Sequence, residues 1–243
     1  MISKGDMEML TLLSSVPRIM IAAAVLPALV LLIYVYKKDV TEKEPGNLLV
    51  NLLLLGALST VFASITELLG QYVLDSISFE SETLKNAILY FIVVALSEEG
   101  FKYLLLRYRT WKEPNFNCTF DGVVYAVFVS LGFAIIENIK YVFAYGLATA
   151  LIRAFTAIPG HACFGVFMGV FYGLAKRHQF DPDGGAACRK FGIAALVVPV
   201  LLHGLYDFTA TSSQVYIFFA VIIAIMFAAV KAVNAASRND SYV

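Results

Sequence analysis

Apolar runs long enough to cross a lipid bilayer dominate the sequence. We count seven of them, near residues 17–36, 47–70, 85–107, 119–146, 150–176, 189–211 and 214–234. A helix needs about 20 mostly apolar residues to cross the hydrocarbon layer, and it satisfies its own backbone hydrogen bonds there. The chain is only 15% charged, against about 25% in soluble domains. We therefore predict an all-α, polytopic helix bundle that forms a single transmembrane domain over residues 1–243.

Basic residues mark one side of the predicted bundle. They lie mainly in the connections after spans one, three and five and in the segment after span seven. The first of these connections alone holds Lys37, Lys38 and Lys43, whereas the opposite side carries few basic residues beside acidic Asp75 and Glu80. Because Lys and Arg accumulate in cytoplasmic loops, we predict a multi-pass cell-membrane protein with its N-terminus outside and its C-terminus in the cytoplasm.

The net charge and the cysteine content narrow the function classes. The net charge is zero, so no basic surface indicates nucleic acid as a partner. The three cysteines, Cys118, Cys163 and Cys188, are odd in number and lack a metal-binding spacing. We predict that all three are free thiols.

The third predicted span carries ionisable residues inside its apolar run. Glu98, Glu99 and Lys102 lie between Ala87 and Leu106. A charge at the centre of a membrane helix costs roughly 2.5–3.5 kcal/mol, so these residues must be paired or functional. Lys102 can reach both carboxylates, but the adjacent acids point in directions about 100° apart. The motif therefore fits either a structural ion pair or two acids with different roles, one paired and one free to exchange a proton.

Three later spans bring further polar residues to the same depth. Glu137 and Asn138 lie in the fourth span, His161 in the fifth, and His203 and Asp207 in the sixth. At about 1.5 Å per residue from the outer span ends, they share one layer with the acids of the third span. Asp207 follows His203 on the same helix face and could orient its imidazole. Each residue alone also fits a helix–helix hydrogen bond, but together they predict one buried site.

Carboxylates and imidazoles in a water-accessible pocket suit hydrolysis. A Glu can deprotonate water, a His can donate to the oxyanion or the leaving amine, and Asn138 could donate to the oxyanion as well. Alternatively, His161, His203 and either Asp207 or a Glu could ligate zinc, with another Glu as base. Because the acid pair lies beside Lys102 rather than in a ligand spacing, we favour a glutamate-activated water. We thus expect no required cofactor and keep zinc as the alternative.

The fifth span has two features that bear on helix packing. Gly165, Gly169 and Gly173 recur at every fourth residue and form a ridge that lets a neighbouring helix approach closely. Pro159 and Gly160 come earlier in the same span, and Pro159 cannot donate a backbone hydrogen bond. We therefore expect a bend at Pro159–Gly160.

Four motifs follow one another on four successive spans. They are Glu98-Glu99-x-x-Lys102, Phe133-x-x-x-Glu137-Asn138, His161-x-x-x-Gly165 and His203-x-x-x-Asp207. In this order they resemble the PrsW family of intramembrane proteases, which is distantly similar to the CAAX prenyl endoproteases and their bacteriocin-processing relatives. The resemblance covers about residues 85–211, including Arg153 ahead of Pro159. One departure is Ala126, where the family pattern has a small Gly, and it bears on packing rather than chemistry.

The resemblance implies a membrane-embedded peptidase of the bacterial plasma membrane. Members of this family cut single-span anti-sigma factors on the extracytoplasmic side, the first cut in regulated proteolysis, so we expect a partner of this kind. The resemblance also implies which residues act. Catalysis would rest on Glu98, Glu99, Glu137, His161 and His203, supported by Lys102, Asn138 and Asp207.

Two other functions fit parts of the pattern. Intramembrane Glu, His and Asp also form proton relays in ion-coupled transporters, although no internal repeat of the kind common in transporters is evident. Seven spans with an outside N-terminus also fit a receptor, but sensing does not require two adjacent acids at the midplane. Of the two, the transporter is the stronger rival to the protease.

Overall fold

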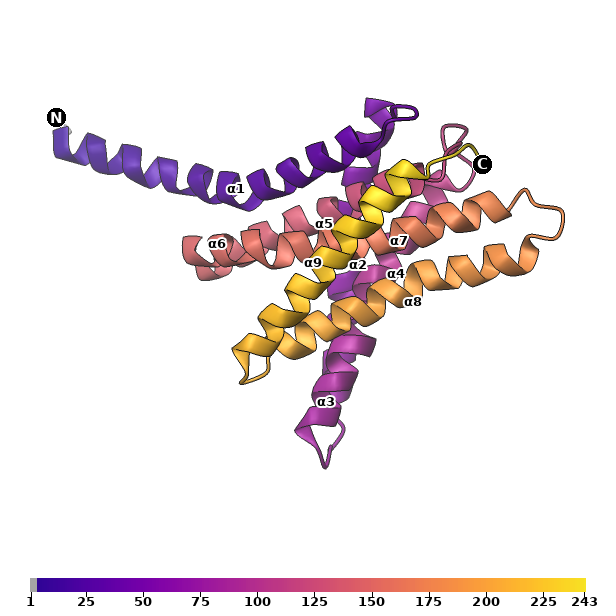
Figure 1. Cartoon of the computed structure of the whole chain (residues 1–243). Helices are drawn as coiled ribbons and strands as arrows, with labels where there is room; N and C mark the ends of the chain where they lie inside the picture. The colour runs from indigo at the N-terminus through magenta and orange to yellow at the C-terminus, as the bar shows by residue number, and fades with distance from the viewer. Residues whose placement is uncertain (1–3) are drawn as a thin grey trace.

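The computed structural model describes residues 4–243, with side chains from Pro17 onward, and its framework is helical (Figure 1). This confirms the predicted all-α class. The elements are α1 (Lys4–Lys38), α2 (Gly46–Asp75), α3 (Glu82–Ile88), the π-helix η1 (Leu89–Ala95), α4 (Leu96–Thr110), α5 (Asp121–Tyr145), α6 (Leu147–Phe155), α7 (Ala157–His178), α8 (Gly185–Ala210) and α9 (Val215–Arg238).

Six helical segments in the described part of the chain are long and apolar enough to cross a membrane. They correspond to six of the seven predicted spans. The remaining one is the third, which is built from α3, η1 and α4 in direct succession and carries the buried Glu98, Glu99 and Lys102. The polytopic bundle is thus confirmed, whereas the membrane crossing of the third predicted span and the orientation stay predictions.

Helix α5 is the axis of the bundle. In the most apolar 18-residue stretch of α5, 78% of the residues are buried inside the bundle. The corresponding share for α9, on the periphery, is 17%. Glycines let its neighbours approach the backbone: a Cβ on Gly132 would overlap the carbonyl oxygen of Leu53 on α2. On the other side, a Cβ on Gly169 of α7 would overlap the Gly122–Val123 backbone of α5. The predicted glycine ridge of the fifth span is therefore confirmed as the contact between α7 and α5.

The fifth predicted span is interrupted close to the predicted position. The break between α6 and α7 lies at Thr156, with φ −122° and ψ −71°. Pro159 and Gly160 lie in the first turn of α7, and Gly160 N donates to Thr156 O at 2.9 Å. The interruption expected from Pro159 is thus present, three residues earlier in the chain, because a proline lacks the backbone N–H and its ring clashes with the carbonyl four residues before it.

The basic connections meet at one end of the bundle, where carboxylates hold the chain together. Asp121 accepts from the backbone N–H groups of Asn117 and Cys118 at 3.0 and 2.6 Å. Asp240 accepts from Phe120 N at 2.8 Å, so residues 239–243 dock on the loop that precedes α5. All three cysteines are free thiols, as predicted.

Two loop carboxyls at the same end are buried. Glu44 accepts from the Tyr125 hydroxyl at 2.6 Å. Asp39 is fully buried, and neither of its carboxylate oxygens has a hydrogen-bond partner among the side chains and backbone that the structure describes. Burial raises the pKa of Asp39 to about 6 and the pKa of Glu44 to about 7.

Candidate active site

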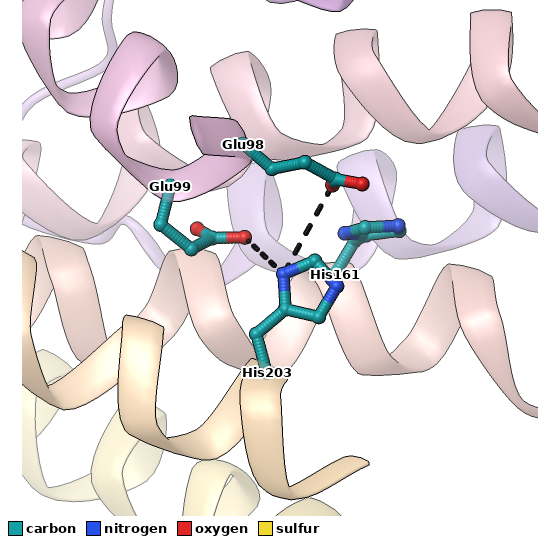
Figure 2. Close-up of side chains that lie close together, drawn as sticks. All are labelled: Glu98, Glu99, His161 and His203. Atoms are coloured by element: carbon teal, nitrogen blue, oxygen red, sulfur yellow. Dashed lines mark hydrogen bonds and ion pairs between the residues drawn. The ribbon is translucent and has the colours of Figure 1, made fainter. Parts of the chain in front are cut away.

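A cavity of about 240 Å³ lies where α2, η1, α4, α5, α6, α7 and α8 meet. Five of the residues singled out from the sequence line it: Glu98, Glu137, His161, His203 and Asp207. The other acid of the third span and Lys102 are fully buried beside them. Figure 2 shows that the two acids and the two histidines point toward one another from three different helical segments. The structure therefore brings the predicted layer together in one place.

The two adjacent acids have different surroundings. Lys102 Nζ lies 2.7 Å from Glu99 Oε1 and 3.2 Å from Glu98 Oε2, so one ammonium bridges both carboxylates. It also lies 3.9 Å from the centre of the Phe133 ring. Glu99 is fully buried, whereas Glu98 is 5% exposed and lines the cavity. Only Glu98 is thus placed to meet a water molecule or a substrate.

The His203 imidazole is held between the Glu98–Glu99 pair on one side and Asp207 on the other. Its Nδ1 lies 2.9 Å from Glu99 Oε1 and 3.9 Å from Glu98 Oε2 (Figure 2). Its Nε2 lies 3.3 Å from Asp207 Oδ2, one helical turn away on α8, as the sequence spacing predicts. The ring also stacks on Phe164 at 4.8 Å. These contacts fix its orientation.

His161 is held in the same manner from the other side of the cavity. Its Nε2 lies 2.8 Å from Glu137 Oε2, and its Nδ1 lies 3.2 Å from Lys102 Nζ. Arg153 Nη2 lies 2.7 Å from the same oxygen of Glu137 and so anchors that carboxylate. Each histidine therefore has one ring nitrogen on a carboxylate at the cavity wall. The other nitrogen of His203 contacts the Glu98–Glu99 pair, whereas that of His161 contacts Lys102, which bridges the pair.

Asn138 does not reach the cavity. Its side chain donates to Ala24 O at 3.0 Å and accepts from Arg153 Nε at 3.0 Å, and it is fully buried. The expected role as an oxyanion donor was therefore wrong, because both ends of the amide are already in use. The residue supports the site indirectly, since it orients the arginine that pairs with Glu137.

The site includes residues that our sequence analysis did not assign to it. Arg153, Glu67, Lys140 and Tyr206 all line the cavity. Glu67 carried a readable signal, because it is an ionisable residue inside the second apolar run. Tyr206 carried none, since an aromatic residue in a membrane span is ordinary.

Four side chains of the site could together hold a divalent metal ion, provided that the Lys102 ammonium, which contacts three of them, moves off His161 Nδ1. Glu98, Glu99, His161 and His203 each offer one ligand atom, and these four atoms lie within 4.8 Å of one another. Metal-binding histidines usually have a carboxylate on their second ring nitrogen, which is the arrangement of both imidazoles with Glu137 and Asp207. Among the described residues, no hydrogen bond reaches the buried Glu99 Oε2. These four residues do not include Asp207, which the sequence suggested as a possible zinc ligand. Asp207 instead contacts His203 Nε2, the ring nitrogen that faces away from the Glu98–Glu99 pair.

The charge balance of the site also favours a bound cation. Five carboxylates line or adjoin the cavity, Glu67, Glu98, Glu99, Glu137 and Asp207, against three basic side chains, Lys102, Lys140 and Arg153. With both imidazoles neutral, two negative charges are in excess. In a low-dielectric environment, such an excess is costly unless protons or a cation neutralise it.

Comparison with known proteins places the chain among related sequences. Residues 44–233 match the family described as PrsW family intramembrane metalloprotease. Protease PrsW of Oceanobacillus iheyensis is 35% identical over 190 residues, which cover 77% of this chain and 81% of the relative. Protease PrsW of Bacillus subtilis is 35% identical over 198 residues, with 81% and 85% covered. Protease PrsW of Clostridioides difficile is 33% identical over 190 residues, with 76% covered in each. No solved structure matches the chain.

Proposed function

The chain belongs to the PrsW family of intramembrane proteases, and from this premise we propose that it cuts a single-span membrane protein of the anti-sigma factor class. The cut would be the first in a regulated proteolytic cascade. The observation that carries the proposal is the meeting of four ligand-type atoms, from Glu98, Glu99, His161 and His203, within 4.8 Å at a buried cavity. We place the peptide bond to be cut in this cavity.

We further propose that the site holds a divalent ion such as zinc. His161, His203 and Glu99 would be its ligands, a set of two histidines and one carboxylate that occurs in catalytic zinc sites. The description of the family as metalloproteases points the same way. A zinc ion bound there would polarise the scissile carbonyl and make a bound water more acidic. The geometry thus favours the alternative that the sequence left open over the metal-free glutamate.

Glu98 is the proposed general base, because it is the acid of the pair that lines the cavity. Its carboxylate takes a proton from the attacking water while the water oxygen bonds to the carbonyl carbon of the substrate. The carbon–nitrogen bond then breaks, and Glu98 returns the proton to the leaving amine. Glu137 and Asp207 act as positioning residues, since each fixes the orientation of one imidazole.

A search for new protein termini tests the proposed function. Membranes that contain the wild-type protein are compared by mass spectrometry with membranes that contain Glu98→Gln, and Glu80→Gln serves as an exposed carboxyl control outside the cavity. We expect a single-span protein with a new terminus in the wild-type and Glu80→Gln membranes, and no such product with Glu98→Gln. Identical termini in all three samples would refute the protease activity in these membranes. Solute movement without cleavage would support the transporter.

A further inference from the structure

A second hollow opens beside the catalytic cavity, between α2 and η1. This groove has a volume of about 410 Å³, and its walls come from α2, η1 and one residue of α5. It is lined by Ser64, Glu67, Leu68, Gln71, Leu89, Val93, Val94 and Lys140. Ser64, Glu67, Val94 and Lys140 also line the catalytic cavity, so the two spaces meet.

The groove has a mainly apolar lining to which Glu67 adds an ionisable group. On α2, Leu68 and Leu69 are 71% and 62% exposed, as expected for side chains that face lipid. Glu67 is partly buried between them and the cavity, and no described side chain forms a hydrogen bond or an ion pair with it. Lys140 is engaged elsewhere, since its Nζ donates to Ser64 Oγ at 3.0 Å. An ionisable group in a membrane helix without a partner marks a pathway or a binding site.

A protease substrate in a membrane supplies a partner of the required chemistry. A peptide bond can be cut only where its carbonyl carbon is accessible, so the substrate must unwind near the cut. Unwound backbone in a bilayer needs hydrogen-bond partners from the protein. The Glu67 carboxylate can accept from such backbone N–H groups. Gln71 is already in use, since its Nε2 donates to Asp75 Oδ1 at 3.0 Å. The groove thus presents Glu67 as a free acceptor beside the cavity, on a residue that lines both spaces.

The π-helix explains how one short segment can line both spaces. Within η1, Tyr90 and Val94 reach the catalytic cavity, whereas Leu89 and Val93 line the groove. A π-helical turn is wider than an α-helical turn and is frequent at functional sites. At Gly70, α2 lies so close to η1 that an added Cβ would be 2.5 Å from Val93 Cγ1. The two walls therefore touch at this point.

We propose that the groove binds an unwound segment of the single-span substrate and leads it to the catalytic cavity, with Glu67 as a specificity-determining contact to its backbone. This inference rests on the proposed function and adds the route by which the substrate enters. The occupant is an extended polypeptide, because its apolar side chains match the leucine and valine lining and its backbone N–H groups can bond to Glu67, which a lipid tail would leave without a partner.

Kinetics of a Glu67→Gln variant test the contact. The amide keeps the size of the side chain but loses the charged acceptor, so we expect KM to rise about tenfold while kcat changes less than about twofold. Glu80→Gln serves as the control and should leave both parameters unchanged. An equal fall in kcat with an unchanged KM would assign Glu67 to the chemical step and overturn its binding role.

Cross-linking from two adjacent residues tests the route. A photoreactive phenylalanine analogue replaces either Leu68, which lines the groove, or Leu69, which is similarly exposed but lies outside it. Both variants carry Glu98→Gln, which is expected to accumulate normally, to trap uncut substrate, and the probe is the single-span protein that gains the new terminus in wild-type membranes. We expect a cross-link at residue 68 at least about fivefold stronger than at residue 69.

Equal or absent cross-links alongside normal wild-type cleavage would overturn the groove alone. Absence of any wild-type cleavage product would overturn both the groove and the proposed function.

Discussion

Glu98→Gln is expected to lower the rate of peptide cleavage about 1,000-fold, within the range for loss of a general base, while the protein still accumulates and binds metal. Glutamine keeps the size of the side chain but cannot take a proton from water. Lys102 retains its shorter contact, the one to Glu99 at 2.7 Å, so the helix should remain stable. The measurement combines cleavage of the single-span substrate with the metal content of the purified protein after dialysis.

Glu99→Gln should differ from Glu98→Gln in two respects. It removes a proposed metal ligand, so the metal content should fall together with the activity. It also leaves the buried Lys102 ammonium without its closer carboxylate, and breaking a buried pair costs about 3–5 kcal/mol. We expect poor accumulation, which Lys102→Met restores without restoring cleavage or metal.

The same measurements distinguish the two chemistries. If the wild-type protein contains no metal and resists strong chelators, the metal proposal is wrong and the metal-free glutamate mechanism replaces it. If Glu98→Gln and Glu99→Gln both cut at near-normal rates in a well-folded protein, the hydrolytic assignment of this site is wrong.

Gly132→Ala is expected to destabilise the bundle by on the order of 3 kcal/mol, because overpacking is costly and backbone cannot move aside as a flexible side chain can. The added methyl group would overlap the Leu53 carbonyl oxygen and push α2 away from α5. The measurement is the thermal unfolding midpoint in detergent, together with the level of the protein in membranes.

Gly192→Ala on α8 is the matched control for Gly132→Ala. A Cβ there would lie 3.6 Å from the Tyr103 hydroxyl, an ordinary contact. The higher helix propensity of alanine should stabilise the helix by up to about 1 kcal/mol. Equal unfolding midpoints for both variants would show that the α2–α5 contact can relax and that the overlap at Gly132 costs little.

Local spacing and depth made much of the site predictable. The pairing of Lys102 with both acids follows from helical geometry, as does the contact of His203 with Asp207 on the same helix. The common depth of the polar residues on antiparallel spans indicated that they would meet. These relations depend only on the rise and turn of a helix, which a sequence determines directly.

Rotation of each helix about its own axis was not predictable from the sequence. Asn138 follows Glu137 directly, but only Glu137 reaches the cavity, while Asn138 bonds to Ala24 on α1. Which of the two side chains reaches the cavity depends on how α5 packs on α1. The spacing of residues within one span does not determine this packing. The interruption of the fifth span was predicted from Pro159, but its exact position at Thr156 was not, because a proline can end a helix anywhere within the preceding turn.

The buried loop carboxyls Asp39 and Glu44 make the stability of the fold depend on pH. Asp39 faces Lys43, Asp240 and Glu42, and Glu44 faces Tyr125, Asp121, Asp39 and Glu42. Their pKa values of about 6 and about 7 exceed the ordinary values of 3.8 and 4.5. Between about pH 4 and pH 7, the folded protein therefore keeps protons on these two carboxyls that an unfolded chain has already released.

The direction of this linkage follows from the raised pKa values. The stabilisation is complete below about pH 4 and is lost as the pH rises through about 6 to 7. Hydrogen exchange of the Thr119 and Phe120 amides, corrected for the intrinsic pH dependence of exchange, should show less protection at pH 8 than at pH 6; equal protection would contradict the linkage. If this end lies in the cytoplasm, as the basic loops predict, a drop in the internal pH of the cell would tighten the attachment of the last helix, and alkalinisation would loosen it.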